Sequence, residues 1–397
     1  MTLARPYDVV LYGASGYTGA LVADCLAQSC AGAGLRWALA GRHLDKLEAV
    51  RSQLHLHSVR DIPDLLHAES GDAGSLHELA RRARVLINTV GPYAAHGDAL
   101  VHACIAQGTH YLDLCDEPQT VDHLRRHWHH LAVRKKVCIL PCCGFMSLPV
   151  DIGVLHLLEG LRHDFGATLR HQRVEVFAGV EADGAISGGT WAALLQSLAE
   201  SGLPRLRRFQ AAQQQALPAR PQYRQDLQRW ALPLVTIDGD VVRQSARLRG
   251  DYGADFRYGH FALGEHLLPM LGLAAGIVGL TLAAQWSPTR QWLQGRLPSG
   301  SGPSAEERAR GWFRISLIAQ VRNRRWQTQV SGGDPGYGAT SHMLTQAALL
   351  LAGGGGIAAY GVLTPASALG LAIIPALERG GVHFAPISRC PPSPALS

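Results

Sequence analysis

Short apolar runs alternate with amphipathic segments through the first third of the chain. Apolar runs of this length are typical of buried strands, whereas apolar positions that repeat every three to four residues predict helices. We expect strands at residues 7–12, 35–40, 64–68, 84–90, 109–114 and 136–140, and helices at 17–28, 43–54, 74–82, 96–107 and 119–134. Strands alternating with helices predict a parallel, doubly wound sheet, the Rossmann type of α/β fold.

The alternation ends near residue 149, where longer polar and mixed segments begin. A chain of 397 residues is long enough to build two cores. Residues 312–330 alternate apolar and polar side chains, as a half-buried strand does. We therefore expect a Rossmann domain at residues 1–149 and a second, α+β domain at residues 150–397 that binds substrate and forms a homodimer.

Residues 266–289 carry no charged side chain and are apolar over most of their length. Such a segment can span a bilayer, lie on a membrane, pack inside the second domain or form a dimer contact. Pro269 and glycines within the run disfavour an independent spanning helix, and Arg290 and Arg296 after it suit anionic headgroups. We favour peripheral membrane contact or a hidden apolar interface over a span.

The overall charge and the cysteines narrow the class of protein. The net charge of +6 comes mostly from dispersed arginines, with one locally basic stretch at residues 205–229, so we expect no nucleic-acid partner. Cysteines in apolar stretches without C-x-x-C spacing indicate buried, reduced thiols, and the histidine pairs lack further ligands at supporting spacing, so no metal site is predicted. We expect a cytoplasmic protein, at the inner face of the membrane where residues 266–289 make contact. The eight cysteines are Cys25, Cys30, Cys104, Cys115, Cys138, Cys142, Cys143 and Cys390.

A glycine-rich turn follows the first predicted strand and opens the first predicted helix. Glycines spaced G-x-x-G-x-x-G let the chain turn sharply and leave backbone N–H groups open to a pyrophosphate at the positive end of a helix. An ordinary tight turn is the alternative, but the position between strand and helix favours a dinucleotide site. The residues concerned are Gly13, Ser15, Gly16, Tyr17, Thr18 and Gly19.

The second predicted strand ends at Arg42. An NAD site usually places a carboxylate here for the ribose 2′-hydroxyl, whereas an arginine pairs with a 2′-phosphate, so we expect NADP(H) as the cofactor. The alternative is that Arg42 is a solvated residue opening the next helix. Gly91 and Pro92 follow the fourth strand, where we expect the chain to pass the nicotinamide, although a simple turn also explains them.

Tyr93, Tyr111 and Asp113 are the polar side chains nearest to this edge of the sheet. Each is a candidate for the group that supplies a proton or balances developing charge during reduction. Each also has a structural explanation, and Asp113 in particular suits a loop cap. The structural explanation is the favoured one, so the catalytic group stays open.

Several separate blocks make the chain resemble the saccharopine dehydrogenase-like oxidoreductases, in particular the branch of trans-acting enoyl reductases. The resemblance implies an NADP(H)-dependent enzyme that reduces an enoyl or carbonyl group of an acyl or lipid-like small molecule. The blocks are residues 13–19, 40–42, 88–93, 108–113, 144–145, 187–190, 333–340 and 363–366.

Two positions depart from the family pattern. Asp116 stands where the family usually has glycine before Glu117, and Met146 stands where it usually has aspartate. Both lie near the expected cleft, so they affect the prediction of the substrate more than the prediction of the cofactor. A membrane-associated scaffold or sensor that binds nucleotide without turnover is the alternative function. Amino-acid chemistry of the saccharopine type is disfavoured because the blocks carry no arginine cluster for carboxylates.

Overall fold

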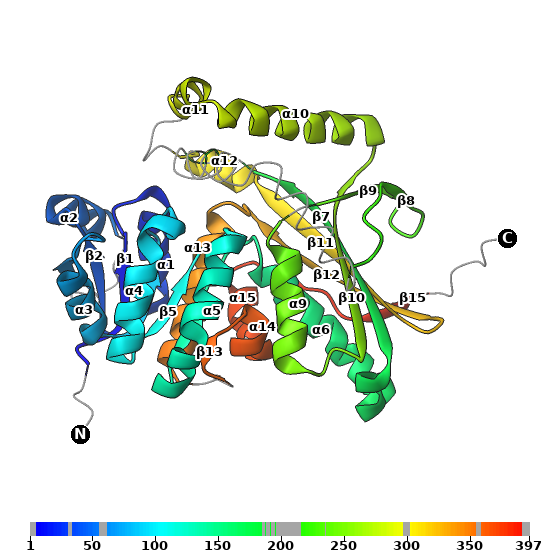
Figure 1. Cartoon of the computed structure of the whole chain (residues 1–397), viewed down its shortest axis with the longest axis horizontal. Helices are drawn as coiled ribbons and strands as arrows, with labels where there is room; N and C mark the ends of the chain where they lie inside the picture. Colours follow the sequence, from blue (N-terminus) through cyan, green and yellow to red (C-terminus); the bar gives the residue numbers. More distant parts are fainter. Residues whose placement is uncertain are drawn as a thin grey trace. The chain divides into compact units, whose positions relative to one another are not determined.

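The chain folds into two compact units (Figure 1). The first unit comprises Met1–Leu148 and Gly336–Gly381, and the second comprises Pro149–Pro335 and Val382–Ser397. The computed structural model describes residues 5–30, 34–54, 62–184, 187, 191, 195, 216–234, 236–296, 302–354 and 359–390.

The first unit is built on a parallel sheet. Its strand order is β13-β6-β5-β4-β1-β2-β3, which contains the Rossmann order 3-2-1-4-5-6. Successive strands are added outward from β1 on one side and from β4 on the other, so the order of addition reverses between β1 and β4. Ligands of such sheets bind outside the carboxyl ends of the strands at this reversal. The strands are β1 (Tyr7–Tyr12), β2 (Trp37–Gly41), β3 (Asp64–His67), β4 (Ala83–Asn88), β5 (His110–Asp113), β6 (Cys138–Leu140) and β13 (Gly361–Val362).

Helices connect these strands as the sequence predicts, with boundaries that differ by a few residues. Local signals account for the ends: the Asp72 side chain accepts a hydrogen bond from the Gly74 N–H at the start of α3, and Gly108 ends α4 in the left-handed conformation. The predicted fold class, a Rossmann domain with a second α+β domain, is confirmed. The connecting helices are α1 (Tyr17–Cys30), α2 (Leu44–Gln53), α3 (Ala73–Arg82), α4 (Tyr93–Gln107) and α5 (Pro118–Lys135).

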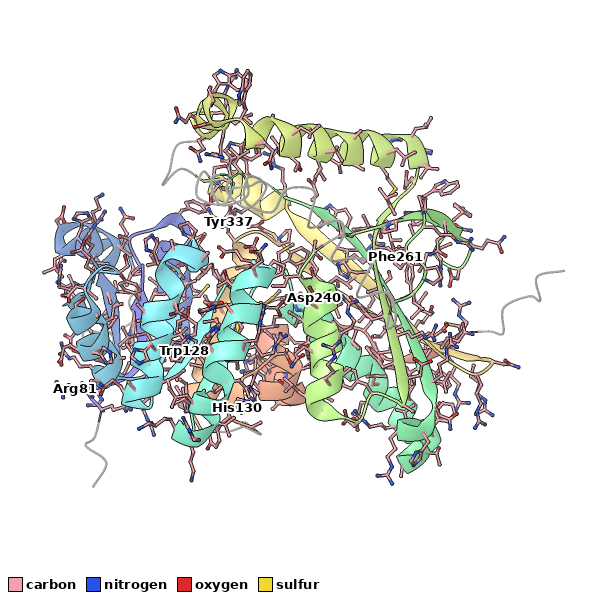
Figure 2. All side chains as sticks on the ribbon, viewed as in Figure 1. Arg81, Trp128, His130, Asp240, Phe261 and Tyr337 are labelled. Atoms are coloured by element: carbon pink, nitrogen blue, oxygen red, sulfur yellow. The ribbon has the colours of Figure 1, made fainter. Side chains whose placement is uncertain are left out.

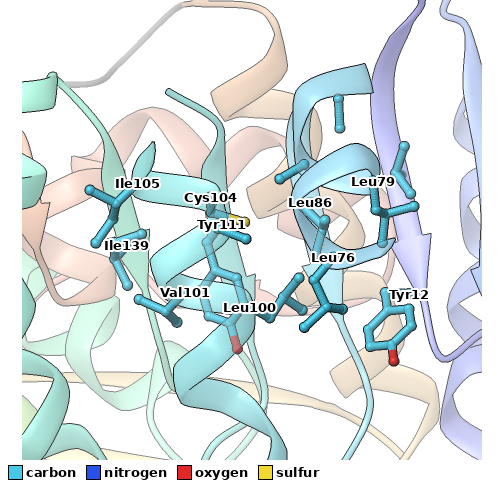
Figure 3. Packing of buried hydrophobic residues seen from close by; sticks show 14 of the residues in the cluster. Tyr12, Leu76, Leu79, Leu86, Leu100, Val101, Cys104, Ile105, Tyr111 and Ile139 are labelled. Carbon is cyan, nitrogen blue, oxygen red and sulfur yellow. The ribbon is translucent and has the colours of Figure 1, made fainter. Parts of the chain in front are cut away.

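One hydrophobic core of the first unit lies between the sheet and helices α3, α4 and α5. Leu76 and Leu79 of α3 and Leu100 of α4 are buried together with Leu86 of β4 and Tyr111 of β5 (Figure 3). Burying such side chains contributes roughly 1.5–3 kcal/mol each. This packing fixes the strand ends that carry the candidate site.

A late segment of the chain completes the first unit. It comprises α13 (Gly338–Ala352), β13, α14 (Pro365–Ala368), a 3-10 turn at Gly370–Ile373 and α15 (Ile374–Arg379). β13 pairs in parallel with β6, and α13 contacts α1, β1, β4 and β5. The Gln346 Nε2 on α13 donates to the Ser29 Oγ on α1 over 3.2 Å.

The expected assignment of all of residues 150–397 to the second domain is therefore wrong for Gly336–Gly381. The physical reason is that a strand's pairing partner is chosen by long-range packing. The two-residue β13 and the buried, uncharged α13 carry no local pattern that says which sheet they cover.

The second unit contains a mixed sheet of order β14-β12-β11-β7-β10-β9-β8, with β15 paired to β12. β10 runs parallel to β7, and the other recorded pairs are antiparallel. Its strands are β7 (Arg173–Asp183), β8 (Gln222–Arg224), β9 (Arg229–Pro233), β10 (Asp255–Gly264), β11 (Trp312–Val321), β12 (Arg324–Gly333), β14 (His383–Phe384) and β15 (Ser388–Cys390).

Two helices, α6 (Leu148–Phe165) and α9 (Asp238–Arg249), belong to this unit, with a 3-10 turn at Gly166–His171. The Ser245 hydroxyl donates to the buried Asp151 carboxylate over 2.8 Å and so joins α9 to α6. Asp164 accepts hydrogen bonds from the Trp326 indole and from Arg389, at 2.7 and 3.0 Å, which ties α6 to β12 and β15. Charged and neutral hydrogen bonds thus hold the helices to the sheet.

The uncharged segment forms α10 (Leu267–Gln285), followed by α11 (Ser287–Gln294) and α12 (Ala305–Arg310). By length and composition alone, α10 is the one helix of the described residues that is suited to crossing a membrane. Its most apolar window has a mean hydropathy of 2.1, yet only 6% of it is buried. The possibility that this segment packs inside the second domain is therefore wrong.

The composition of the first unit predicts how fragments of the chain behave. Residues 1–149 alone should show no cooperative thermal unfolding, because α13 is missing from β1, β4 and β5 and β6 loses its β13 partner. Residues 1–149 joined by a short Gly/Ser linker to residues 336–381 should unfold cooperatively in calorimetry. A cooperative transition of the same midpoint in both fragments would contradict this division of the chain.

Candidate functional site

The turn between β1 and α1 requires glycine at its first position. Gly13 has a φ of +91°, a conformation that other residues rarely adopt. A Cβ on Gly13 would lie 2.7 Å from Val90 Cγ2 and 2.8 Å from Thr89 Oγ1. The end of β1 therefore packs directly against the chain that follows β4.

The other two glycines of the turn have different surroundings. A Cβ on Gly19 would overlap the carbonyl oxygen of Gly13 and lie 2.9 Å from Ala14 Cα, so the first turn of α1 packs against the loop. A Cβ on Gly16 would meet only the Gly13 oxygen at 3.4 Å, and Gly16 is exposed. In a dinucleotide-binding loop, the first glycine makes the tight turn, the second lets the pyrophosphate approach the backbone, and the third lets the helix pack closely against the strand. The loop therefore fits a pyrophosphate at the start of α1.

The remaining predicted loop residues lie on the same turn. Ser15 is exposed, whereas Tyr17 and Thr18 are half-buried in the first turn of α1. That turn presents backbone N–H groups and the positive end of the helix dipole. The structure thus brings together the residues that the glycine pattern selected.

Tyr337, which belongs to the block at residues 333–340, lies against this turn. Its ring meets the Tyr17 ring edge to face, with centroids 4.9 Å apart and an interplanar angle of 87°. Tyr337 precedes α13 and is labelled in Figure 2. Its signal was the glycine-rich block at residues 333–340, which predicts a turn but not its position.

The turn residues of this block, followed by Thr340 and Ser341, are typical of a capped helix that starts near residue 340. The helix α13 begins earlier, at Gly338, and its N-cap residue Tyr337 makes no side-chain cap. Instead the Thr340 Oγ1 accepts a hydrogen bond from the Phe145 N–H over 3.0 Å. Thus the blocks around residues 17, 145 and 340 meet in one unit, while most of the block at 187–190 lies outside the described residues.

Arg42 directly follows β2, the neighbour of β1 in the sheet. It is exposed, and its Nε donates to the His43 ring over 3.1 Å. Gly91 and Pro92 are exposed after β4. These three residues lie at the carboxyl ends of β2 and β4, on either side of the glycine turn.

The start of α4 depends on Glu117, which the sequence did not single out as a site residue. The Glu117 carboxylate accepts hydrogen bonds from the N–H groups of Tyr93 and Ala94, at 3.0 and 2.8 Å. An acidic side chain at a helix N-terminus also interacts favourably with the helix dipole. Glu117 therefore connects the loop after β5 to the start of α4. The sequence shows an acidic residue, Glu117, just before the predicted helix at 119–134, but it does not show that its side chain reaches the start of another helix.

Tyr111 and Asp113 form a buried network with Asn88. The Tyr111 hydroxyl donates to Asp113 over 2.8 Å and accepts from the Asn88 Nδ2 over 3.0 Å. Asp113 also accepts from the N–H groups of Cys115 and Cys142, at 2.9 and 3.2 Å. This network joins the loops that follow β4, β5 and β6.

Burial sets the protonation of these groups. It raises the pKa of Asp113 to about 6, although the hydrogen bonds to its carboxylate oppose the shift. Burial and the nearby Asp113 raise the pKa of Tyr93 well above its usual value. The Tyr93 hydroxyl donates to the Asn88 carbonyl and accepts from the Leu114 N–H, each over 3.3 Å. The contacts of all three candidates support the loops, and a catalytic role stays a prediction.

Sequence comparison places the chain in a family. The sequence model of the saccharopine dehydrogenase NADP-binding domain matches residues 9–136. A Mycobacterium tuberculosis protein, provisionally named a trans-acting enoyl reductase, is 34% identical over 96% of this chain and 97% of its own. The chain belongs to the saccharopine dehydrogenase-like oxidoreductases. The family resemblance drawn from the sequence is confirmed, and so is the prediction of NADP(H) binding.

Other proteins match over similar lengths. A Mus musculus protein named saccharopine dehydrogenase-like oxidoreductase is 28% identical over 98% of this chain and 99% of its own. A Caenorhabditis elegans protein named as lipid droplet localized is 29% identical over 87% and 89%. Saccharopine dehydrogenase (L-Glu forming) of Saccharomyces cerevisiae shares the fold, with a TM-score of 0.54 at 12% identity, over 96% of this chain and 99% of that one.

The buried network predicts a pH-dependent effect of Tyr111→Phe in this saccharopine dehydrogenase-like protein. The change leaves Asn88 and Asp113 short of a partner and should lower the free energy of unfolding by about 1–3 kcal/mol. Because Tyr111 lowers the pKa of Asp113, its loss raises that pKa further above the unfolded value. A carboxyl with a raised folded-state pKa favours folding at low pH and loses that contribution as pH rises through it. Urea unfolding should therefore show a larger deficit near about pH 8 than near about pH 5.

Tyr252→Phe is the matched control. Tyr252 is equally buried in the second unit, but its hydroxyl has no hydrogen-bond partner among the described residues. Removing it should leave stability unchanged or raise it. Equal losses in both variants, or a Tyr111→Phe deficit that does not depend on pH, would contradict the assigned role of the network.

Proposed function

We propose that this protein is an NADP(H)-dependent reductase of an enoyl or carbonyl group in an acyl or lipid-like substrate. The observation that carries the proposal is the three-glycine turn beside the reversal point between β1 and β4. Membership of an oxidoreductase family with an NADP-binding domain supports the redox class. The substrate class rests on the further observations below.

The proposed cofactor contacts follow the turn and its flanks. Gly13 and Gly19 shape the loop, and Gly16 leaves room for the pyrophosphate beside Ser15, Tyr17 and Thr18. Arg42 binds the 2′-phosphate, since a guanidinium at the end of β2 complements it and a carboxylate would repel it. Gly91 and Pro92 border the nicotinamide. These residues are Gly13, Ser15, Gly16, Tyr17, Thr18, Gly19, Arg42, Gly91 and Pro92.

The bound cofactor supplies a hydride, and the chain's own residues bind and orient it. Tyr93, Tyr111 and Asp113 are proposed to act as positioning residues. Their hydroxyl and carboxyl groups hold the loops after β4, β5 and β6 through the hydrogen bonds described above. Exact loop placement matters because misplacing the reacting groups by about 1 Å lowers rates about 100-fold.

Two features of this chain support an apolar substrate. Met146, where the family usually has an aspartate, is an exposed apolar side chain next to Phe145. The helix α10 exposes an apolar surface. Two relatives carry names that refer to enoyl reduction and to lipid droplets. Together these observations favour a lipid-like substrate over an amino acid.

We further propose that the second unit binds the substrate, mediates a homodimer and contacts a membrane from the cytoplasmic side. The exposure of α10 supports the membrane contact. A nucleotide-binding scaffold without turnover is the second candidate. It is favoured by the fact that Tyr93, Tyr111 and Asp113 all have structural partners.

Arg42→Ala tests the cofactor assignment. Losing a charged hydrogen-bonding partner of the 2′-phosphate should weaken NADPH binding about 10- to 100-fold and leave NADH binding unchanged. Fluorescence titration with each nucleotide measures both. Lys46→Ala removes a nearby exposed charge on α2 and should alter neither affinity. Retained NADPH preference in Arg42→Ala would show that Arg42 does not read the phosphate.

Turnover tests the reductase itself. Acyl substrates carrying an enoyl or carbonyl group should cause a saturable loss of NADPH absorbance, and Arg42→Ala should lower kcat/KM with NADPH by the same factor as binding. Tight NADPH binding with no oxidation across a panel of lipid extracts would instead favour the scaffold.

A further inference from the structure

The helix α10 is apolar around its circumference and exposed along its length. Leu268, Leu273 and Leu282 are 80%, 69% and 61% exposed. Leu280 and Ala284 near its end pack with Trp191, and Met270 near its start contacts Gly264. The helix has no polar face to leave in water, so a groove on a protein partner would cover only part of it. A lipid phase covers each side that the second unit leaves exposed.

The chain leaves the second sheet at the end of β10 and re-enters it at the start of β11, and both points lie beside the carboxyl end of β7. β10, which precedes α10, pairs with β7 so that Ala262 faces Val180, and β11, which follows α12, pairs with β7 so that Trp312 faces Asp183. The two flanking strands are therefore separated only by β7, about 10 Å apart. Gly264 and Trp312 also line one pocket of about 430 Å³. Both ends of the insertion are thus fixed on the same side of any membrane.

This geometry excludes a spanning orientation. A helix of 19 residues is about 28 Å long and would place Trp286 on the far side of the hydrocarbon layer. Residues 287–311, which lead back to β11, would then have to cross the layer again with their charged side chains, and such side chains are costly in hydrocarbon. The structure describes no second helix there that is long and apolar enough to cross. The charges concerned are Arg290, Arg296, Glu306, Glu307, Arg308 and Arg310.

The residues after α10 match a membrane interface. Trp286 and Trp292 are 72% and 59% exposed, and the Arg296 guanidinium lies 4.3 Å from the centre of the Trp292 ring. Tryptophan concentrates at the headgroup level of membranes, and arginine interacts with anionic headgroups. No acidic residue occurs between Glu265 and Glu306. The charge of the segment therefore complements an anionic surface.

We infer that α10 embeds parallel to the surface in a single leaflet of an anionic phospholipid membrane, with both of its ends on the same side. α11 lies at the headgroups, where Trp286 and Trp292 anchor it and Arg290 and Arg296 pair with lipid phosphates. The inference rests on the membrane contact in the proposed function and specifies its geometry. It holds the second unit at the membrane face without a transmembrane segment.

Vesicle flotation tests the occupant. The full chain should float with vesicles of phosphatidylcholine and phosphatidylglycerol, and Leu273→Asp with Val278→Asp should reduce binding more than about 100-fold. Both side chains are exposed, so the variant keeps its packing. Ile62→Asp, on an exposed apolar residue of the first unit, should float normally. Arg290→Gln and Arg296→Gln should each weaken binding about fivefold, and only to anionic vesicles.

A membrane-impermeant maleimide tests the orientation. Cysteines are introduced at Glu265 and Gln291, one on each side of α10, after Cys25→Ser and Cys390→Ser remove the two partly buried thiols. Both new thiols should be labelled from outside intact vesicles, whereas Leu273→Cys should be protected. Protection of the Gln291→Cys thiol until detergent is added would show a span and overturn the inference.

The remaining outcomes also decide the question. Failure of the full chain to float would overturn the inference. If the chain also forms a dimer that Leu273→Asp dissociates, α10 binds a second copy of the chain instead of lipid. NADPH binding by each variant provides a separate readout of the first unit. Intact NADPH binding without flotation would reject the membrane geometry alone, whereas flotation without turnover would reject only the proposed reductase.

Discussion

No side chain fits between the first turn of α1 and the end of β1, and the arrangement of the first unit depends on this close contact. A Cβ on Gly19 would overlap the Gly13 carbonyl, and a Cβ on Gly13 would press on Thr89 and Val90 after β4. The contact brings the carboxyl end of β1, the start of α1 and the chain after β4 together. A dinucleotide pyrophosphate requires this combination of a helix N-terminus and bare backbone.

The loops around this contact are held by buried polar groups. Asn88, Tyr111 and Asp113 join the loops after three neighbouring strands, and Glu117 secures the start of α4. Satisfied networks of this kind rigidify a site because each broken bond would leave a buried group unpaired. The raised pKa of Asp113 shows the cost of holding a carboxylate there.

The second unit carries a different constraint. In its sheet, β7 pairs with β10 on one side and with β11 on the other. The chain between β10 and β11 contains α10, which is exposed. Apolar surface of this extent is unfavourable in water and marks a site of contact. The positions of both ends of the insertion beside β7 constrain how α10 meets a partner as much as the hydropathy of the helix does.

Local patterns in the sequence were sufficient for the Rossmann strands and helices, the glycine turn and the position of Arg42, because each depends on neighbouring residues and on a regular period. The same was true of the apolar character of residues 266–289. Tyr337 against Tyr17, Thr340 bound to Phe145, and the return of Gly336–Gly381 to the first sheet were not predictable in this way. They join residues far apart in the chain, and no local signal specifies such a partner.

The sequence by itself determined the cofactor class and the existence of an uncharged helix. Only the tertiary structure decided which distant segment completes the first unit and that β10 ends and β11 begins beside the same end of β7. The physical reason is that backbone conformation and hydropathy are properties of short segments, whereas strand pairing and helix packing are chosen by the burial of surfaces from the whole chain.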